Sequence, residues 1–190
     1  MVDDQYLEAH TVGELKQRTT PIEILDYDPA WPQRFTEESA KIRAALGETT
    51  CEVEHVGSTS VPGLPAKPII DIVLVVPDSA AESKYAPQLE SAGYRLRIRE
   101  PEWFEHRLFK GANDGVNLHV FSAGCPEIER MLQFRDWLRI NAADRELYAR
   151  TKRALAQQNW KYTQNYADAK TNVIQEIIAR ASRPSANRSR

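Results

Sequence analysis

The chain has 190 residues, of which 42% are hydrophobic and 27% are charged, and its formal net charge at pH 7 is -2. This composition is that of an ordinary soluble globular protein and excludes the fibrous and disordered classes. The nearly neutral charge also excludes the bulk positive field that recruits long DNA or RNA, so any site for a polyanion has to be local.

The cysteines and the hydropathy pattern indicate a cytoplasmic protein. Cys51 and Cys125 lie far apart, with no second thiol or histidine cluster at zinc spacing, so we expect neither a disulfide framework nor a zinc site. No segment approaches the roughly 18 apolar residues of a membrane-spanning helix, and the acidic start does not resemble a signal peptide. We therefore expect no membrane partner.

The length suits one folded unit. Residues 1–20 are polar without a sustained period, which predicts an N-terminal arm partly ordered on the body. Residues 21–181 are predicted to form a single domain, with a sheet core at 21–125 and a helical part at 126–181. Residues 182–190 contain three arginines and are predicted to be a flexible tail.

The first elements of the domain surround an irregular loop. Residues 22–25 suit a short strand, and Asp28 and Pro29 suit the cap and first turn of a helix that runs to about Leu46 and stops at Gly47. Strands are predicted at 51–56 and 68–76, as neighbours in one sheet. Two glycines and three prolines in residues 57–68 predict a shaped loop between them.

The rest of the chain continues the sheet and then becomes helical. A helix is predicted at 79–92, followed by strands at 94–98, 106–109 and 116–121, which gives a sheet of about five strands. After Pro126, apolar residues recur at helical spacing in 128–138, 147–157 and 166–178. We expect these helices to pack on the sheet.

The loop that opens at Gly57 carries groups that bind phosphate. Glycine lets the backbone approach a phosphate without a Cβ in the way, while Ser58, Thr59 and Ser60 add donors. Lys67 lies just before the next strand and can place a compact positive charge on a phosphoryl oxygen. The spacing is not that of a Walker loop, because no Gly-Lys-Ser/Thr follows.

Asp71 stands in the middle of an otherwise apolar strand. A buried carboxylate among Ile and Val costs several kcal/mol if it is unpaired, so it has to be neutralised, hydrogen-bonded or coordinated. Mg²⁺ held between this carboxylate and a phosphate would satisfy it. The alternative is that the loop only turns the chain and that Asp71 pairs with Lys67 or an arginine.

Two segments resemble the signature of the GrpB family, also called UPF0157. They are residues 54–64, Glu-His-Val-Gly-Ser-Thr-Ser-Val-Pro-Gly-Leu, and residues 66–72, Ala-Lys-Pro-Ile-Ile-Asp-Ile. The resemblance extends to residues 27–32, 106–110, 117–121, 134–138 and 166–171, and covers about 22–181. It implies an α/β (α+β) fold of the nucleotidyltransferase-like, polymerase-β type: a mixed sheet with helices packed on it and a C-terminal helical segment.

In that superfamily a Gly-Ser loop holds ATP or another NTP, and carboxylates hold Mg²⁺ or Mn²⁺. Active members place two carboxylates at alternate strand positions, whereas Val73 here offers none. Two-metal catalysis needs several oxygen ligands, so Glu54 and Glu105 are the candidate substitutes. His119 lies on the strand that can carry a third carboxylate in relatives, and is a candidate acid, base or ligand, or else a hydrogen-bonded core histidine.

The remaining candidates have equally plain structural alternatives. Arg107 and Lys110 can contact phosphates or belong to a solvated edge strand. His55, Arg135 and Lys170 are candidates for substrate binding, although helix charges usually form exposed faces or interhelical pairs, as we also expect for Asp136, Lys152 and Asp168.

The first functional hypothesis is therefore an NTP- and Mg²⁺-dependent enzyme that transfers a nucleotidyl group to a small molecule or activates a carboxylate by adenylation, which can serve amide ligation. The alternative is a non-catalytic nucleotide-binding or assembly module, because GrpB relatives also occur fused to dephospho-CoA kinase. The expected partners are a nucleotide and a small acceptor, in a monomer or homodimer without long nucleic acid.

Overall fold

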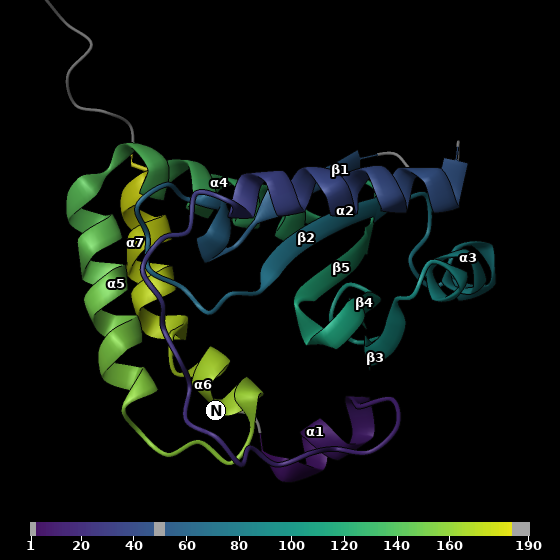
Figure 1. The fold of residues 1–190 in the computed structure, drawn as a ribbon, viewed down its shortest axis with the longest axis horizontal. Coiled ribbons are helices and arrows are strands. Elements are labelled where there is room, and N and C mark those ends of the chain that lie inside the picture. The colour runs from purple at the N-terminus through teal and green to yellow at the C-terminus, as the bar shows by residue number, and fades with distance from the viewer. Residues whose placement is uncertain (1–2, 48–51, 184–190) are drawn as a thin grey trace, which may run out of the picture.

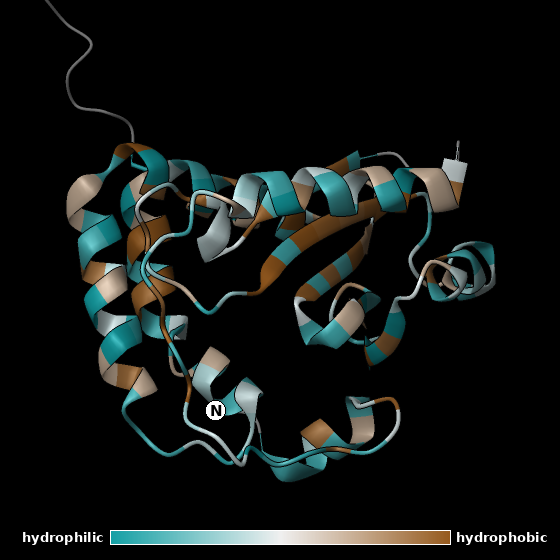
Figure 2. Ribbon diagram, viewed as in Figure 1, coloured by the Kyte–Doolittle hydropathy of each residue, from teal (hydrophilic) through white to brown (hydrophobic). Residues whose placement is uncertain are grey.

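The computed structural model describes residues 3–47 and 52–183. Its centre is a five-stranded mixed sheet, as expected, in the order β1-β2-β5-β4-β3. The strands are β1 (Glu52–Val56), β2 (Ile70–Val76), β3 (Arg95–Glu100), β4 (His106–Lys110) and β5 (Val116–Ser122). β2 and β5 are parallel, and the other neighbours are antiparallel. β2 lies between β1 and β5, which explains its nearly continuous hydrophobic sequence (Figure 2).

One face of the sheet is covered by α2 (Trp31–Leu46) and α3 (Ala86–Ser91) (Figure 1). Trp31 and Ile42 of α2 are fully buried in one cluster with Ile72, Leu74 and Val120 of the sheet. Ile72 and Leu74 alternate with Asp71 along β2, so their side chains lie on the apolar face of the sheet and the Asp71 side chain lies on the opposite face. The main hydrophobic core therefore lies on the face of the sheet opposite Asp71.

The other face is partly covered by the C-terminal helices α4 (Pro126–Ile140), α5 (Ala142–Ala156), α6 (Thr163–Asp168) and α7 (Thr171–Ala181). Val73, Val75 and Phe121 pack with Ile128 of α4. A separate cluster joins Val61 and Leu64 of the loop to residues of α4, α5 and α7. These contacts tie the loop to the helical part, and they place α5 and α7 beside it (Figure 1).

Several expected elements differ in extent. The helix expected at 79–92 is divided into a 3₁₀ turn, η3 (Glu82–Lys84), and α3, because Pro87 lacks the N–H that a continuous helix needs and its ring would crowd the preceding turn. Of residues 22–25, only Leu25 makes a β-bridge, to Ala66. The expected helix at 166–178 is interrupted between α6 and α7 at residues 169–170, and α5 begins five residues before its expected start at 147.

The start of α2 also differs from its predicted cap. Asp28 Oδ1 accepts a hydrogen bond of 2.9 Å from the Ala30 amide, so its carboxylate closes a turn that precedes the helix. The helix itself begins at Trp31, with Pro32 rather than Pro29 in its first turn. The stop expected at Gly47 is observed, and there the backbone φ of +55° suits a residue without a Cβ.

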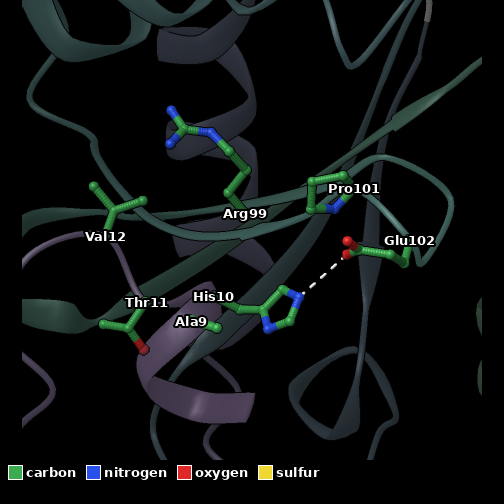
Figure 3. Close-up of a pocket in the computed structure, with 7 residues that line it drawn as sticks. All are labelled: Ala9, His10, Thr11, Val12, Arg99, Pro101 and Glu102. Carbon is green, nitrogen blue, oxygen red and sulfur yellow. Dashed lines mark hydrogen bonds and ion pairs between the residues drawn. The ribbon is translucent and has the colours of Figure 1, made fainter. Parts of the chain in front are cut away.

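The N-terminal arm contains a helix, α1 (Asp4–His10), that lies against β3. The Val12 amide donates to the Arg97 carbonyl, and Thr11 bridges Ile98. Figure 3 shows the pocket between this arm and β3, where His10 reaches the Glu102 carboxylate at 3.2 Å. No helix among the described residues is long and apolar enough to cross a membrane. Most of the predicted tail, residues 184–190, lies outside the described part of the chain, as does Cys51.

Candidate functional site

Gly57 brings the loop backbone directly against Asp71. Val56, the last residue of β1, pairs with Asp71 on β2, so the loop leaves the sheet beside the carboxylate. Gly57 has a φ of +68°, and a Cβ at this position would lie 2.8 Å from the Asp71 Cβ. Any side chain here would therefore collide with Asp71 and also strain the backbone. The sequence requires glycine at this point because the loop and the carboxylate form one surface.

The two hydroxyls that follow Ser58 hold the loop in shape. Ser60 Oγ donates to the Gly57 carbonyl at 2.6 Å, and Thr59 Oγ1 donates to the Ile69 carbonyl at 3.3 Å while it accepts from His55 Nε2 at 3.0 Å. Both residues are buried. The hydroxyls of Thr59 and Ser60 therefore fix the 3₁₀ turn η2 (Ser58–Ser60) instead of standing free as the predicted phosphate donors.

Ser58 is the loop hydroxyl that remains on the site, and α5 supplies its partner. Lys152 Nζ donates to Ser58 Oγ at 2.9 Å and also to the Pro65 carbonyl. The side chain of Tyr148, one helical turn earlier on α5, also contacts Ser58 through a hydrogen bond. Lys152 is only 2% exposed. Burial, reinforced by the charge of Lys170, lowers the pKa of Lys152 to about 6.

Asp71 lies in a row of polar side chains across three strands. Asn117 Nδ2 donates to Asp71 Oδ1 at 2.6 Å, and Lys110 Nζ donates to Asn117 Oδ1 at 2.5 Å. His119 Nε2 lies 3.9 Å from the same Asp71 oxygen. Burial opposes ionisation of Asp71, but His119, the Asn117 hydrogen bond and Lys67 hold its pKa below the usual value. With 27% of its side chain exposed, this carboxylate is charged and accessible.

Lys67 and Lys170 add positive charge on the other side of the site. Their ammonium groups lie 5.4 Å and 4.9 Å from the centre of the Tyr166 ring. Burial and the nearby Lys170 charge lower the pKa of Lys67 to about 8. The Tyr166 hydroxyl is buried without a hydrogen-bond partner. We call Lys67, Lys152 and Lys170 the lysine cluster, and within residues 3–47 and 52–183 none of the three forms an ion pair.

Two predicted site residues lie on the opposite face of the sheet. Arg107 pairs in register with Val120, and His55 with Ile72, so both side chains project toward α2 and α3 rather than toward Asp71. Arg107 is 4% exposed and is held by Glu82 at 2.5 Å. The predicted phosphate role of Arg107 and the substrate role of His55 are therefore corrected to structural ones.

His55 also has packing and titration properties that suit a core residue. Its ring stacks on Phe35 with the ring centres 4.7 Å apart. Burial lowers the pKa of His55 to about 4, so the ring is neutral at physiological pH.

The predicted metal ligands are not brought together. Glu54 accepts from Arg135 Nη1 at 2.7 Å, which links β1 to α4, and Glu105 accepts from Arg107. Val73 is fully buried. Across the described ranges no group of three His, Cys, Asp or Glu side chains is arranged to hold a metal ion. Among the described residues the donor set therefore lacks the several oxygen ligands of a two-ion centre. Arg135 is held in an ion pair with Glu54, and its substrate role stays a prediction.

Sequence reasoning missed three members of the site. Lys152 and Tyr148 were expected on an ordinary helix, although their separation of four residues places them on one helix face. Asn117, two residues before His119, shares the Asp71 face of β5 by strand alternation. Both spacings were visible in the sequence, but only the packing of α5 on the loop shows that Lys152 is buried.

The sheet, its Gly-Ser loop and the helices around them define the nucleotidyltransferase-like fold. A solved structure of Cid1 in complex with its short product ApU aligns with a TM-score of 0.50 and 11% identity over 68% of this chain and 42% of that one. At that identity the likeness shows the fold alone. It confirms the expected class, a mixed sheet of the polymerase-β type with packed helices.

Within that class the chain belongs to the GrpB family, whose model matches residues 21–180. A UPF0157 protein of Halalkalibacterium halodurans is 60% identical over 94% of this chain and 92% of its own length. The crystal structure of the conserved protein GrpB from Enterococcus faecalis aligns with a TM-score of 0.74 and 32% identity, over 84% of this chain and 96% of that one. A dephospho-CoA kinase of Mycolicibacterium paratuberculosis is 30% identical over 78% of this chain but only 43% of its own length.

Proposed function

We propose that this protein binds a nucleoside triphosphate, ATP or another NTP, on the loop at residues 57–60 and transfers its nucleotidyl group to a small molecule. An acceptor hydroxyl or amine attacks the α-phosphorus, the bond from that phosphorus to the bridging oxygen breaks, and pyrophosphate leaves. A carboxylate acceptor would be adenylated in the same way, which prepares it for displacement by an amine. The fold relation to nucleotidyltransferases supports this reaction class.

The observation that carries the proposal is the gathering of three lysines beside the Gly-Ser loop, none of which has an ion-pair partner within the described residues. Lys67 and Lys152 both have lowered pKa values because each is buried near Lys170. Like charges gathered in a partly dry pocket are costly unless an anion joins them. The phosphate chain of a nucleotide is such an anion, and it would favour the charged forms of Lys67 and Lys152.

Each side chain then has a distinct task. The Ser58 hydroxyl and the backbone amides of Gly57 and Ser58 bind phosphate oxygens, and the lysine cluster neutralises the charge that grows on pyrophosphate. Asp71 supplies one carboxylate oxygen, which suits a nucleotide that arrives as its Mg²⁺ complex, since Mg²⁺ commonly uses one or two carboxylates together with phosphates. His119 lies 3.9 Å from Asp71 and would accept the proton of a hydroxyl or amine acceptor.

Calorimetry with each NTP, with and without Mg²⁺, tests the binding step. Saturable binding is expected, and no binding by the unaltered protein at millimolar nucleotide would remove the NTP form of the proposal. Release of pyrophosphate on mixing with pooled small acceptors tests the transfer step. Asp71→Asn preserves the shape of the side chain and should abolish metal-dependent release, with Asp26→Asn, at an exposed carboxylate paired with Arg153, as the matched control.

A second candidate is a non-catalytic nucleotide-binding or assembly module. The observation that favours it is Val73, which is fully buried where active relatives of the wider superfamily place a second carboxylate. The relation to part of a dephospho-CoA kinase supports an assembly role. Nucleotide binding without pyrophosphate release from any pooled acceptor would favour this candidate over the enzyme.

A further inference from the structure

A continuous chain of hydrogen bonds runs from the N-terminal helix to the candidate site. The Tyr6 hydroxyl donates to Glu100 Oε1 at 2.8 Å, and Glu100 Oε2 meets His106 Nδ1 at 2.7 Å. His106 Nε2 then meets His119 Nδ1 at 3.1 Å. The chain ends at His119 Nε2, which faces Asp71 Oδ1 across 3.9 Å.

The chemistry of each group decides which atoms carry the protons. Burial opposes ionisation of Glu100, but the hydrogen bonds from His106 and Tyr6 hold its pKa below the usual value, so it is a carboxylate that only accepts. His106 Nδ1 must therefore carry a proton. Burial lowers the pKa of His106 to about 4, so its ring is neutral and Nε2 has a free lone pair.

The same reasoning fixes the next ring. Because His106 Nε2 is an acceptor, His119 Nδ1 has to be the donor of the 3.1 Å hydrogen bond. His119 Nε2, on the other side of the ring, faces Asp71 Oδ1 across a gap of 3.9 Å, which is too long for a direct hydrogen bond. His119 is 20% exposed, so a ligand can reach this gap.

We propose that Glu100 and His106 are positioning residues: they hold His119 through the hydrogen bond from its Nδ1–H, so that Nε2 is aimed at the gap beside Asp71 in which the hydroxyl or amine of a small acceptor binds. The incoming O–H or N–H group lies between His119 Nε2 and the Asp71 carboxylate, and these two groups together fix its orientation. The catalytic part of this inference rests on the proposed transfer reaction.

Tyr6 gives the N-terminal arm a part in this arrangement. It lies in α1, ahead of the residues 21–180 that the family model matches, and its hydroxyl occupies the Glu100 oxygen that does not face His106. The Tyr6 hydrogen bond holds the Glu100 carboxylate so that its other oxygen, Oε2, faces Nδ1 of the His106 ring. The arm therefore completes a support that the matched domain does not contain by itself.

Nitrogen-15 NMR of the imidazole rings, in protein without nucleotide, tests the tautomer independently of turnover. We expect His119 to show a protonated Nδ1 that is hydrogen-bonded to His106 Nε2, and an unprotonated Nδ1 would overturn the inference. In His106→Phe, which keeps the ring contacts with Trp103 and Phe121, His119 loses its Nδ1 acceptor and should move its proton to Nε2, toward Asp71. His55→Phe, on the other face, is the matched control.

Turnover provides the second readout. His106→Phe should lower kcat by about tenfold to a hundredfold with little change in the KM for nucleotide, which is the usual size of a loss of an orienting group. An unchanged kcat or an unchanged His119 tautomer in this variant would overturn the positioning role. If the unaltered protein releases no pyrophosphate, the transfer reaction and the base role of His119 fail together, while the NMR result still decides the tautomer.

Discussion

Replacing Lys152 with methionine should make the protein more stable and at the same time abolish nucleotide binding. Methionine has a similar length and no charge, so it fills the space without the cost of burying an amine. The pKa of Lys152 falls from 10.5 to about 6 on folding. At pH 7 this difference corresponds to a penalty of about 5 kcal/mol, taken as an upper bound at 1.36 kcal/mol per unit.

Part of that gain is lost because methionine cannot donate to Ser58 Oγ and the Pro65 carbonyl. Leaving a buried carbonyl without a partner costs about 1–3 kcal/mol. We expect a net stabilisation of about 2 kcal/mol, or a rise in Tm of about 4–8 °C for a chain of this size. Lys161→Met, at an exposed lysine paired with Asp4, is the matched control and should leave nucleotide affinity unchanged.

The buried Lys152 also predicts how the stability of the protein changes with pH. Between about pH 6 and pH 10.5 the unfolded chain keeps a proton on Lys152 that the folded protein has lost. Stability of the unaltered protein should therefore rise with pH through this window, by up to about 1.4 kcal/mol per unit, and fall as the pH is lowered toward 6. Chemical denaturation across this range measures the slope. Lys152→Met should lose that contribution, and a variant that is less stable and still binds nucleotide would refute the reasoning.

Three further changes test other parts of the structure. Gly57→Ala places a Cβ 2.8 Å from the Asp71 Cβ at a φ of +68°. It should lower the free energy of unfolding, measured with denaturant, by at least about 1–2 kcal/mol and weaken nucleotide binding in calorimetry. Unchanged stability together with unchanged affinity would contradict the close approach of the loop to Asp71. Arg107→Met removes one of the two arginines that hold Glu82, which keeps its pair with Arg99, so it should cost about 1–3 kcal/mol. Nucleotide binding measured below its Tm should stay unchanged, and a selective loss of affinity would return Arg107 to the site. Nucleotide affinity should weaken between pH 7 and pH 9, because binding then has to protonate Lys152. Calorimetry in buffers of different ionisation enthalpy should show that the complex takes up a proton on binding. Proton release on binding would contradict this role of Lys152.

The parts of the fold that were predictable are those with dense local information. The β-branched run around Asp71 predicts a buried strand, and Gly57 with the prolines of residues 57–68 predicts a shaped loop; both are observed. The break at Pro87 was also visible in the sequence, because proline removes a donor and its ring crowds the preceding helical turn. Helical periodicity by itself does not reveal this break in the helix.

The composition of the site was harder to predict because it depends on register and tertiary packing. Whether Arg107 or Lys110 faces Asp71 depends on which residue of β4 lies opposite Asn117, and that pairing is known only in the folded sheet. Lys152 looks like an ordinary charge on a helix until α5 packs on the loop and buries it. The role of Tyr6 likewise depends on a contact across 94 residues.

The most direct test of the central claim is calorimetric titration of the unaltered protein and Lys152→Met with Mg²⁺-bound ATP and the other NTPs. The account predicts saturable binding of at least one nucleotide by the unaltered protein, with uptake of a proton at pH 8, and loss of that binding in a variant that is folded and more stable. Equal binding by both proteins, or binding by neither at millimolar nucleotide, would contradict the claim that the lysine cluster and the loop at residues 57–60 hold the phosphates.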